Sequence, residues 1–320
     1  MTTTRGGGRP ALAGAPWDPS AAHRFVTGDR TPLYVDDSGP AGDPEAPGPT
    51  LILLHGWTLD HTEWDEVLAA LPGSPHALRT IRYDHRGHGG SGPAPKGTAT
   101  VEQAADDLAE LIAERVPAGP IVLVGHSMGG MTIMALVERH PHLLPRIAGA
   151  AFVATSSGGL DKLNYGLPRW LALRVANTER RLNRRLAGLD RTALLNRPGV
   201  ARPGLRWLVF GRKPDRRAVV HTAAQVGRCH PASMVGFRAS MGTHQRRAAL
   251  AALRDTPTVV LAGGADRLLP VSHARVIAEE LGTELLIYPD AGHMLNVERA
   301  EQVTDRIARL LVGASAPRHS

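Results

Sequence analysis

The chain has 320 residues, of which 42% are hydrophobic, so it can form one large domain or one domain with a sizeable insertion. No apolar run approaches the roughly 18–20 residues that span a bilayer, and residues 1–16 lack the apolar segment of a secretory signal. The single cysteine, Cys229, excludes an intramolecular disulfide and favours a cytoplasmic location; we interpret it as a bystander thiol.

The net charge of +7 is unevenly distributed along the chain. Between residues 161 and 217 there are 15 Lys and Arg but 4 Asp and Glu, which leaves the remainder acidic. We interpret this basic segment as a solvated helical face, with attraction for anionic substrates or surfaces as the alternative. It has few aromatic side chains that could stack on bases, so no nucleic-acid partner is expected.

Strand-like and helix-like patterns alternate in the first half of the chain. Residues 24–27 and 32–36 predict an antiparallel hairpin at a sheet edge, and 38–49, rich in Pro, Gly and Ala, predict a loop. Buried strands are predicted at 50–54, 79–83, 121–124 and 147–153, and helices at 64–71, 101–116 and 128–140. This alternation is typical of a parallel α/β sheet.

The alternation stops after residue 153, because helical patterns broken by prolines occupy about 157–245. It resumes with strands at 258–261 and 284–288 and helices at 272–281 and 297–312. We therefore expect a mostly parallel eight-stranded α/β sheet flanked by helices, with an inserted helical lid over the carboxyl edge where ligands bind. The expected divisions are flexible tails at 1–20 and 314–320, a core of 21–156 and 246–313, and a cap at 157–245.

The strongest chemical signal is Gly125-His126-Ser127-Met128-Gly129, which follows an apolar strand and opens a helix. A serine on so sharp a turn needs small residues two positions before and after it, and Gly125 and Gly129 provide them. The turn exposes the Ser127 hydroxyl, and the helix N-terminus directs its amide dipoles to the same point. We predict that Ser127 is a nucleophile.

A serine nucleophile requires a general base, and we select His293 from the 15 histidines. His293 lies in the loop after the last predicted strand, and Asp266 follows the preceding strand, so both loops open at the same sheet edge as Ser127. The chain order of serine, aspartate and histidine is the one this arrangement requires. Asp290 is the alternative to Asp266, although its position suits a turn better.

An oxyanion needs two backbone amides. One is expected from Met128, directly after the nucleophile. The other is expected from Trp57, because Gly56 lets the loop after strand 50–54 pass close to a substrate.

With these motifs the chain resembles the α/β-hydrolase family, in particular its lid-bearing esterase and C–C hydrolase-like branch. The matching segments, in family order between residues 24 and 312, are His55-Gly56-Trp57, residues 84–91, residues 125–130, Gly264-Ala265-Asp266 and Ala291-Gly292-His293. The resemblance implies the α/β-hydrolase fold, the triad and oxyanion hole named above, and a supporting role for the loop 84–91. Relatives that use an aspartate nucleophile, such as epoxide hydrolases and haloalkane dehalogenases, do not fit because the position is Ser127.

No metal or other cofactor is expected. His85 and His88 lie beside Asp84, but no fourth ligand is evident in the sequence. The glycine-rich stretch 87–92 lacks the Lys-Ser/Thr pair of a phosphate-binding loop.

The expected activity is hydrolysis of a carboxylic ester, thioester or lactone of a small to medium, partly hydrophobic substrate through an acyl-enzyme, by a monomer or homodimer. C–C bond hydrolysis, perhydrolysis and acyl transfer use the same triad and remain open, as does a ligand-sensing receptor with little turnover. We interpret most apolar side chains of the lid as packing. The candidates for a substrate pocket are Trp57, His126, Trp170, Trp207, Phe210, Phe237 and Met294.

Overall fold

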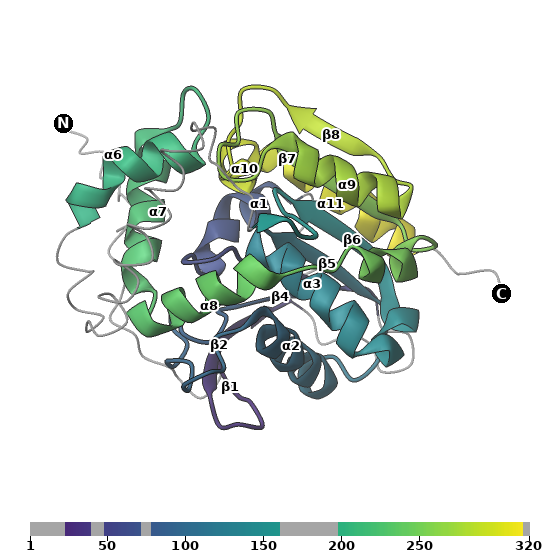
Figure 1. Cartoon of the computed structure of the whole chain (residues 1–320). Coiled ribbons are helices and arrows are strands. Elements are labelled where there is room, and N and C mark those ends of the chain that lie inside the picture. The colour runs from purple at the N-terminus through teal and green to yellow at the C-terminus, as the bar shows by residue number, and fades with distance from the viewer. Residues whose placement is uncertain (1–22, 40–47, 72–77, 161–197, 316–320) are drawn as a thin grey trace, which may run out of the picture.

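The computed structural model describes residues 23–39, 48–71, 78–160 and 198–315. Its centre is an eight-stranded sheet in the order β1-β2-β4-β3-β5-β6-β7-β8 (Figure 1). The strands are β1 (Arg24–Val26), β2 (Pro32–Ser38), β3 (Thr50–Leu54), β4 (Thr80–Tyr83), β5 (Ile121–His126), β6 (Ile147–Val153), β7 (Thr258–Gly263) and β8 (Leu285–Tyr288). Strand β2 pairs antiparallel with β1 and β4, and the other pairings are parallel. The mostly parallel eight-stranded sheet predicted from the sequence is therefore confirmed.

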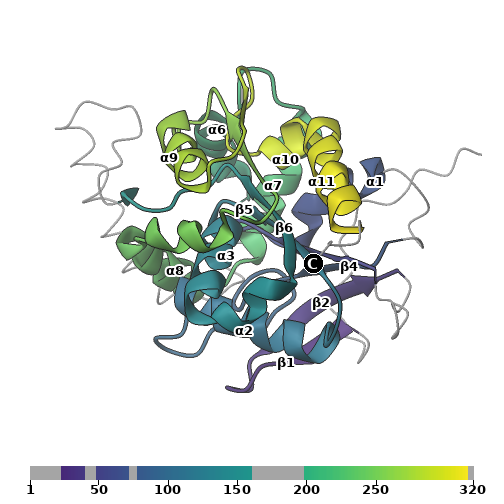
Figure 2. The same cartoon turned by 90° about the vertical axis from the view of Figure 1, so that its right-hand side faces the viewer.

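Helices cover both faces of the sheet. Figure 2 shows α2 (Val101–Arg115) and α3 (Met128–Arg139) on one side, and α1 (Asp65–Ala70) and α11 (Ala300–Ser315) on the other. The remaining helices are α6 (Pro198–Val209), α7 (Arg216–Arg228), α8 (Pro231–Thr243), α9 (Val271–Leu281) and α10 (Leu295–Glu298), with 3₁₀ segments at His61–Trp64, Pro141–Arg146 and Ala248–Leu253. Thr100 caps α2 by accepting from the Gln103 amide, and Gly282, in the left-handed region at φ 67°, ends α9.

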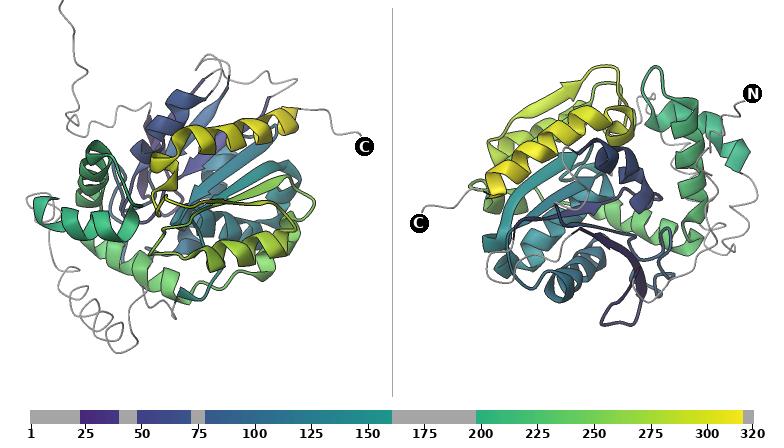
Figure 3. Two further views of the ribbon diagram at one scale, coloured as in Figure 1. Left: turned by 90° about the horizontal axis from the view of Figure 1, so that it is seen from above. Right: turned by 180° about the vertical axis from the view of Figure 1, so that it is seen from behind.

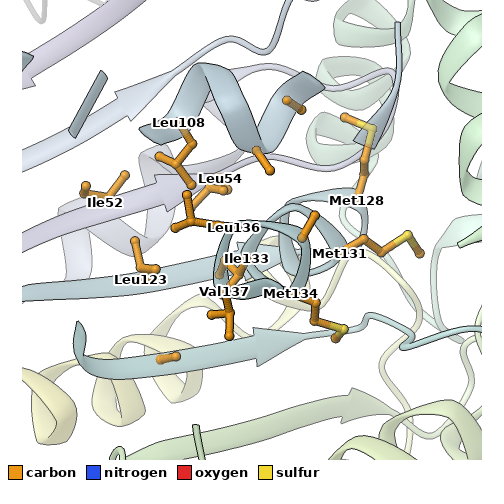
Figure 4. Packing of buried hydrophobic residues seen from close by; sticks show 14 of the residues in the cluster. Ile52, Leu54, Leu108, Leu123, Met128, Met131, Ile133, Met134, Leu136 and Val137 are labelled. Carbon is orange, nitrogen blue, oxygen red and sulfur yellow. The ribbon is translucent and has the colours of Figure 1, made fainter. Parts of the chain in front are cut away.

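The central strands are wholly apolar because both of their faces are buried. In β3, Ile52 and Leu54 pack toward α2 and α3, whereas Leu51 and Leu53 join the cluster formed with α1 and α11. Figure 4 shows the first of these clusters, with Leu108 of α2 and Leu136 of α3 against the sheet. This packing fixes the carboxyl ends of β3, β5, β7 and β8, from which the candidate functional residues emerge.

Helices α6, α7 and α8, referred to below as the inserted helices, lie between β6 and β7 in sequence. Figure 3 shows them to one side of the sheet. An antiparallel bridge joins Gly158 to Gln245, so the two ends of the insertion lie together. The predicted tail 1–20 and the predicted lid residues 161–197 fall outside the described residues.

One expected element is divided in the structure. The helix predicted at 297–312 is observed as α10 and α11, separated at Arg299, whose φ of −138° is not helical. Glu298, the last residue of α10, accepts through its carboxylate from the amides of Gly211 and Gly292. Helix α11 then continues to Ser315, two residues into the tail expected at 314–320.

Within the described ranges, no helix combines the length and the apolar character needed to cross a membrane.

A buried ion pair fixes the loop that follows β4. The guanidinium of Arg86 is fully buried and donates to Asp107 at 2.7 Å, to Asp29 at 2.7 Å and to Thr98 at 2.8 Å. Burial raises the pKa of Asp107 more than the hydrogen bonds from Arg86 lower it. The loop 84–91 is thus held by α2 and by the β1–β2 turn, as its predicted supporting role requires.

We expect Arg86→Met to reduce the free energy of unfolding by about 3–5 kcal/mol, because it leaves the Asp107 carboxylate buried without its cationic partner. The measurement is urea unfolding at neutral pH. Arg139→Met is the matched control, since the Arg139–Asp106 pair is partly exposed and is expected to contribute less than about 1 kcal/mol. Equal losses of unfolding free energy in the two variants would show that the buried Arg86 pair stabilises the fold no more than the partly exposed pair does.

Candidate active site

Ser127 lies on the turn between β5 and α3. Its backbone has φ 51° and ψ −114°, a conformation that non-glycine residues rarely adopt and that marks functional turns. The turn is held from the β6 side, because the Ser127 amide donates to the Val153 carbonyl at 2.9 Å and the Thr155 hydroxyl donates to the Ser127 carbonyl at 2.6 Å. The strand–turn–helix context predicted for Ser127 is therefore present.

The two glycines of the motif are required by close backbone approaches. A β-carbon on Gly125 would lie 2.5 Å from the carbonyl carbon of Gly129, and one on Gly129 would lie 2.3 Å from the carbonyl oxygen of Leu54. Neither obstacle is a flexible side chain that could move away. The turn can therefore pack against β3 only with glycine at both positions.

His293 and Asp266 meet at the same edge of the sheet, in the loops after β8 and β7. His293 Nδ1 lies 2.8 Å from Asp266 Oδ2, and both side chains are buried. The other oxygen, Oδ1, accepts from the amides of Leu268 and Leu269, each at 2.8 Å, which fixes the carboxylate. Because a carboxylate only accepts, Nδ1 carries a proton, and in the neutral tautomer this leaves the lone pair on Nε2.

The alternative residue, Asp290, does not take this position. Its side chain is 62% exposed and lies 3.4 Å from Arg212. The structure thus brings Asp266, and not Asp290, to His293.

Two amides at this edge are available for an oxyanion. Within the described part of the chain, neither the Trp57 amide nor the Met128 amide donates to a protein acceptor. The Gly56 carbonyl accepts from the Leu59 amide at 3.1 Å and from His55 Nδ1 at 2.8 Å. Since the carbonyl and amide of one trans peptide point in opposite directions, these bonds also fix the direction of the Trp57 N–H.

A buried pair that the sequence reasoning missed lies beside the candidate triad. His126 Nδ1 is 3.0 Å from Glu63 Oε2, and His126 Nε2 is 3.0 Å from the carbonyl oxygen of His293. Burial lowers the pKa of His126, but the Glu63 carboxylate outweighs burial and the pKa is raised. Glu63 belongs to no recognisable motif, because it contacts the site across 63 residues of sequence.

The candidate pocket residues are in different environments. Phe210 and Met294 are buried together in one cluster with Leu59, and Phe237 is buried in the main core against His88. Trp207 is 50% exposed and lies under the guanidinium of Arg267. His126 has both ring nitrogens bonded within the protein, so it faces the support of the site rather than a substrate. Trp170 lies outside the described residues.

Of the groups considered for metal binding, Asp84 is bonded to protein partners, whereas both ring nitrogens of His85 and Nε2 of His88 are buried without a hydrogen-bond partner among the described residues. Asp60, His61 and Asp84 are close enough to share an ion. However, Asp60 is paired with Arg228 at 2.6 Å, and Asp84 accepts from the His61 ring at 2.8 Å and from the Gly90 amide at 2.6 Å. Burial lowers the pKa of His88 to about 3, which keeps its ring neutral.

Comparison with known proteins gives relatives of several activities. The chain is 34% identical to "Probable oxidoreductase EphD" of Mycobacterium tuberculosis over 126 residues, and it spans 20% of the length of that protein. It is 28% identical over 250 residues to a pimeloyl-[acyl-carrier protein] methyl ester esterase of Aromatoleum aromaticum, which is 77% of this chain and 91% of the esterase.

A solved structure of a thermophilic esterase from Thermogutta terrifontis superposes with a TM-score of 0.71 at 25% identity, covering 92% of this chain and 98% of the esterase. The sequence model of one family, described as alpha/beta hydrolase fold, matches residues 49–300, which is most of the chain. Together with the sheet order and the turn at Ser127, this match shows that the chain belongs to the alpha/beta hydrolase fold family.

Proposed function

We propose that this protein is a serine hydrolase that cleaves a carboxylic ester, thioester or lactone through an acyl-enzyme. The observation that carries the proposal is the buried hydrogen bond from His293 to Asp266 beside the strained turn of Ser127. Similarity to an esterase along nearly its whole length supports ester hydrolysis.

In the proposed mechanism, His293 Nε2 removes the proton of Ser127 as Oγ attacks the carbonyl carbon. Asp266 stabilises the imidazolium that forms, and the amides of Met128 and Trp57 donate to the developing oxyanion. His293 then protonates the leaving group, and a water deprotonated by the same nitrogen releases the acid. Each step uses groups of this chain and needs no cofactor.

We further propose that the inserted helices act as a cap that shapes the substrate site. They contact the loops that follow the parallel strands: the Trp57 indole donates to the Met234 carbonyl at 3.0 Å, Arg228 pairs with Asp60, and the Met294 amide donates to the Val209 carbonyl at 3.0 Å. Apolar side chains at this junction, including Phe210 and Met294, favour a partly hydrophobic acyl or alcohol group.

We expect Ser127→Ala to lower kcat by about 10⁶, to the background rate, since it removes the nucleophile. The measurement is p-nitrophenol release from acyl esters ranging from acetate to laurate, and the chain-length profile of the unaltered protein sizes the pocket.

Ser156→Ala is the matched control, because Ser156 also contacts a histidine, His273 at 2.8 Å, but donates its proton to the Gly158 carbonyl. It should keep most of the activity. Turnover that survives in Ser127→Ala would overturn the serine mechanism. If the unaltered protein cleaves no ester, C–C cleavage or ligand sensing takes precedence.

The cap proposal predicts the effect of Trp57→Phe, which keeps the backbone amide and an aromatic ring but removes the indole N–H. One lost hydrogen bond of about 1 kcal/mol should raise KM for the longer esters about fivefold and leave kcat nearly unchanged. Trp207→Phe, at a half-exposed position, is the control. A fall in kcat at constant KM would instead show that the indole acts on the chemical step.

A further inference from the structure

The hydrogen bonds of the pair formed by Glu63 and His126 define which of their atoms carry protons. A carbonyl oxygen only accepts, so the contact with His293 O requires a proton on His126 Nε2. The contact between His126 Nδ1 and the Glu63 carboxylate requires a second proton between them. The ring is therefore a double donor when Glu63 is ionised, and the two side chains share one proton in a site closed to solvent.

The same pair connects the three segments that supply the proposed chemistry. Glu63 Oε1 accepts from the Gly56 amide at 3.2 Å, next to the peptide that presents the Trp57 N–H. His126 directly precedes Ser127 and holds the carbonyl of His293. Glu63 is itself fixed, since its carbonyl accepts from Asn296 Nδ2 at 3.2 Å.

The approach of these segments is close. A β-carbon on Gly56 would lie 2.8 Å from His126 Nδ1, so the loop after β3 rests directly on the imidazole. The rings of His126 and His293 have centroids 5.0 Å apart. A displacement of His126 would therefore be passed on to both the general base and the oxyanion loop.

We propose that Glu63 and His126 are positioning residues, which hold the main chain of His293 and the Gly56–Trp57 peptide in register with Ser127 through a chain of buried hydrogen bonds. This inference rests on the proposed function of Ser127 and His293. The pair would then affect the rate of the chemical step, because a misplacement of reacting groups by about 1 Å in an active site can lower the rate about 100-fold.

A merely structural pair would behave differently. Removal of one partner of a merely structural pair would lower the free energy of unfolding but would leave the ratio of kcat to KM of the folded protein unaltered. The two roles are therefore separable by kinetics.

The first experiment compares Glu63→Gln with Glu63→Leu, using p-nitrophenyl butyrate. In Glu63→Gln, the new side-chain amide can donate its N–H to His126 Nδ1 and accept from the Gly56 amide, so all the bonds persist without charge. We expect this variant to keep kcat within about fivefold, whereas Glu63→Leu should lower kcat about 100-fold with little change in KM. Unchanged kcat in a folded Glu63→Leu variant, or equal losses in both variants, would overturn the proposal.

The second experiment needs no turnover and covers a Leu variant that fails to fold. The charged groups around His126 are Glu63 and, farther away, Asp266; the catalytic imidazole of His293 faces it from the loop after β8. Because the folded pKa of His126 is raised, the stabilisation from the shared proton is complete below about pH 6.5 and is lost as pH rises through the folded pKa.

The thermal midpoint of the unaltered protein should therefore fall relative to that of Glu63→Gln as the pH rises above about 6.5. Parallel curves would show that no such proton is shared, and would overturn the proposal whether or not the protein cleaves esters. Absence of esterase activity in the unaltered protein, in contrast, would count against the proposed function of Ser127. The pH comparison would then still test whether Glu63 and His126 share a proton.

Discussion

The turn at Ser127 is packed so closely that it leaves no space for a side chain at Gly125 or Gly129. The remaining parts of the candidate site are arranged around this packed turn. Because Gly129 rests on the Leu54 carbonyl, the turn at Ser127 and the loop after β3 are set by the same backbone approach. Strain at Ser127 is tolerated because hydrogen bonds from Ser127 to Val153 and from Thr155 to Ser127 hold the turn from the β6 side.

Three carboxylates, two of them buried and that of Glu298 half-buried, organise the loop that carries His293. Glu298 accepts from the Gly292 amide on one side, and Glu63 acts through His126 on the His293 carbonyl on the other. Asp266 orients the imidazole itself. Backbone groups in a loop at a closed sheet edge have few water molecules to bond, so these carboxylates satisfy donors that would otherwise be costly to bury. Burial raises the pKa of Glu298 more than the amides of Gly292 and Gly211 lower it, which is consistent with this closed environment.

The parts of the fold that can be predicted from the sequence are those that depend on residues close together in the chain. Apolar strands such as β3 are recognisable because both faces are buried, and Ser127 is recognisable because its turn requires glycines at fixed spacing. Glu63 was not predictable, since its partners Gly56 and His126 are identified only after the chain has folded. The break at Arg299 was not predicted either, because no Gly or Pro marks it in the sequence. The roles of Ser127, His293 and Asp266 stay predictions until activity is measured.

The junction between α6 and the His293 loop has a consequence for how this chain can diverge. A β-carbon on Gly292 would lie 2.4 Å from the Phe210 carbonyl carbon, and one on Gly211 would lie 2.0 Å from the Asp290 carbonyl oxygen. The insertion and the loop are therefore interlocked through main chain rather than through replaceable side chains. An exchange of the segment between β6 and β7 for that of a relative would have to carry over this interlock, so the insertion is not an independent structural module.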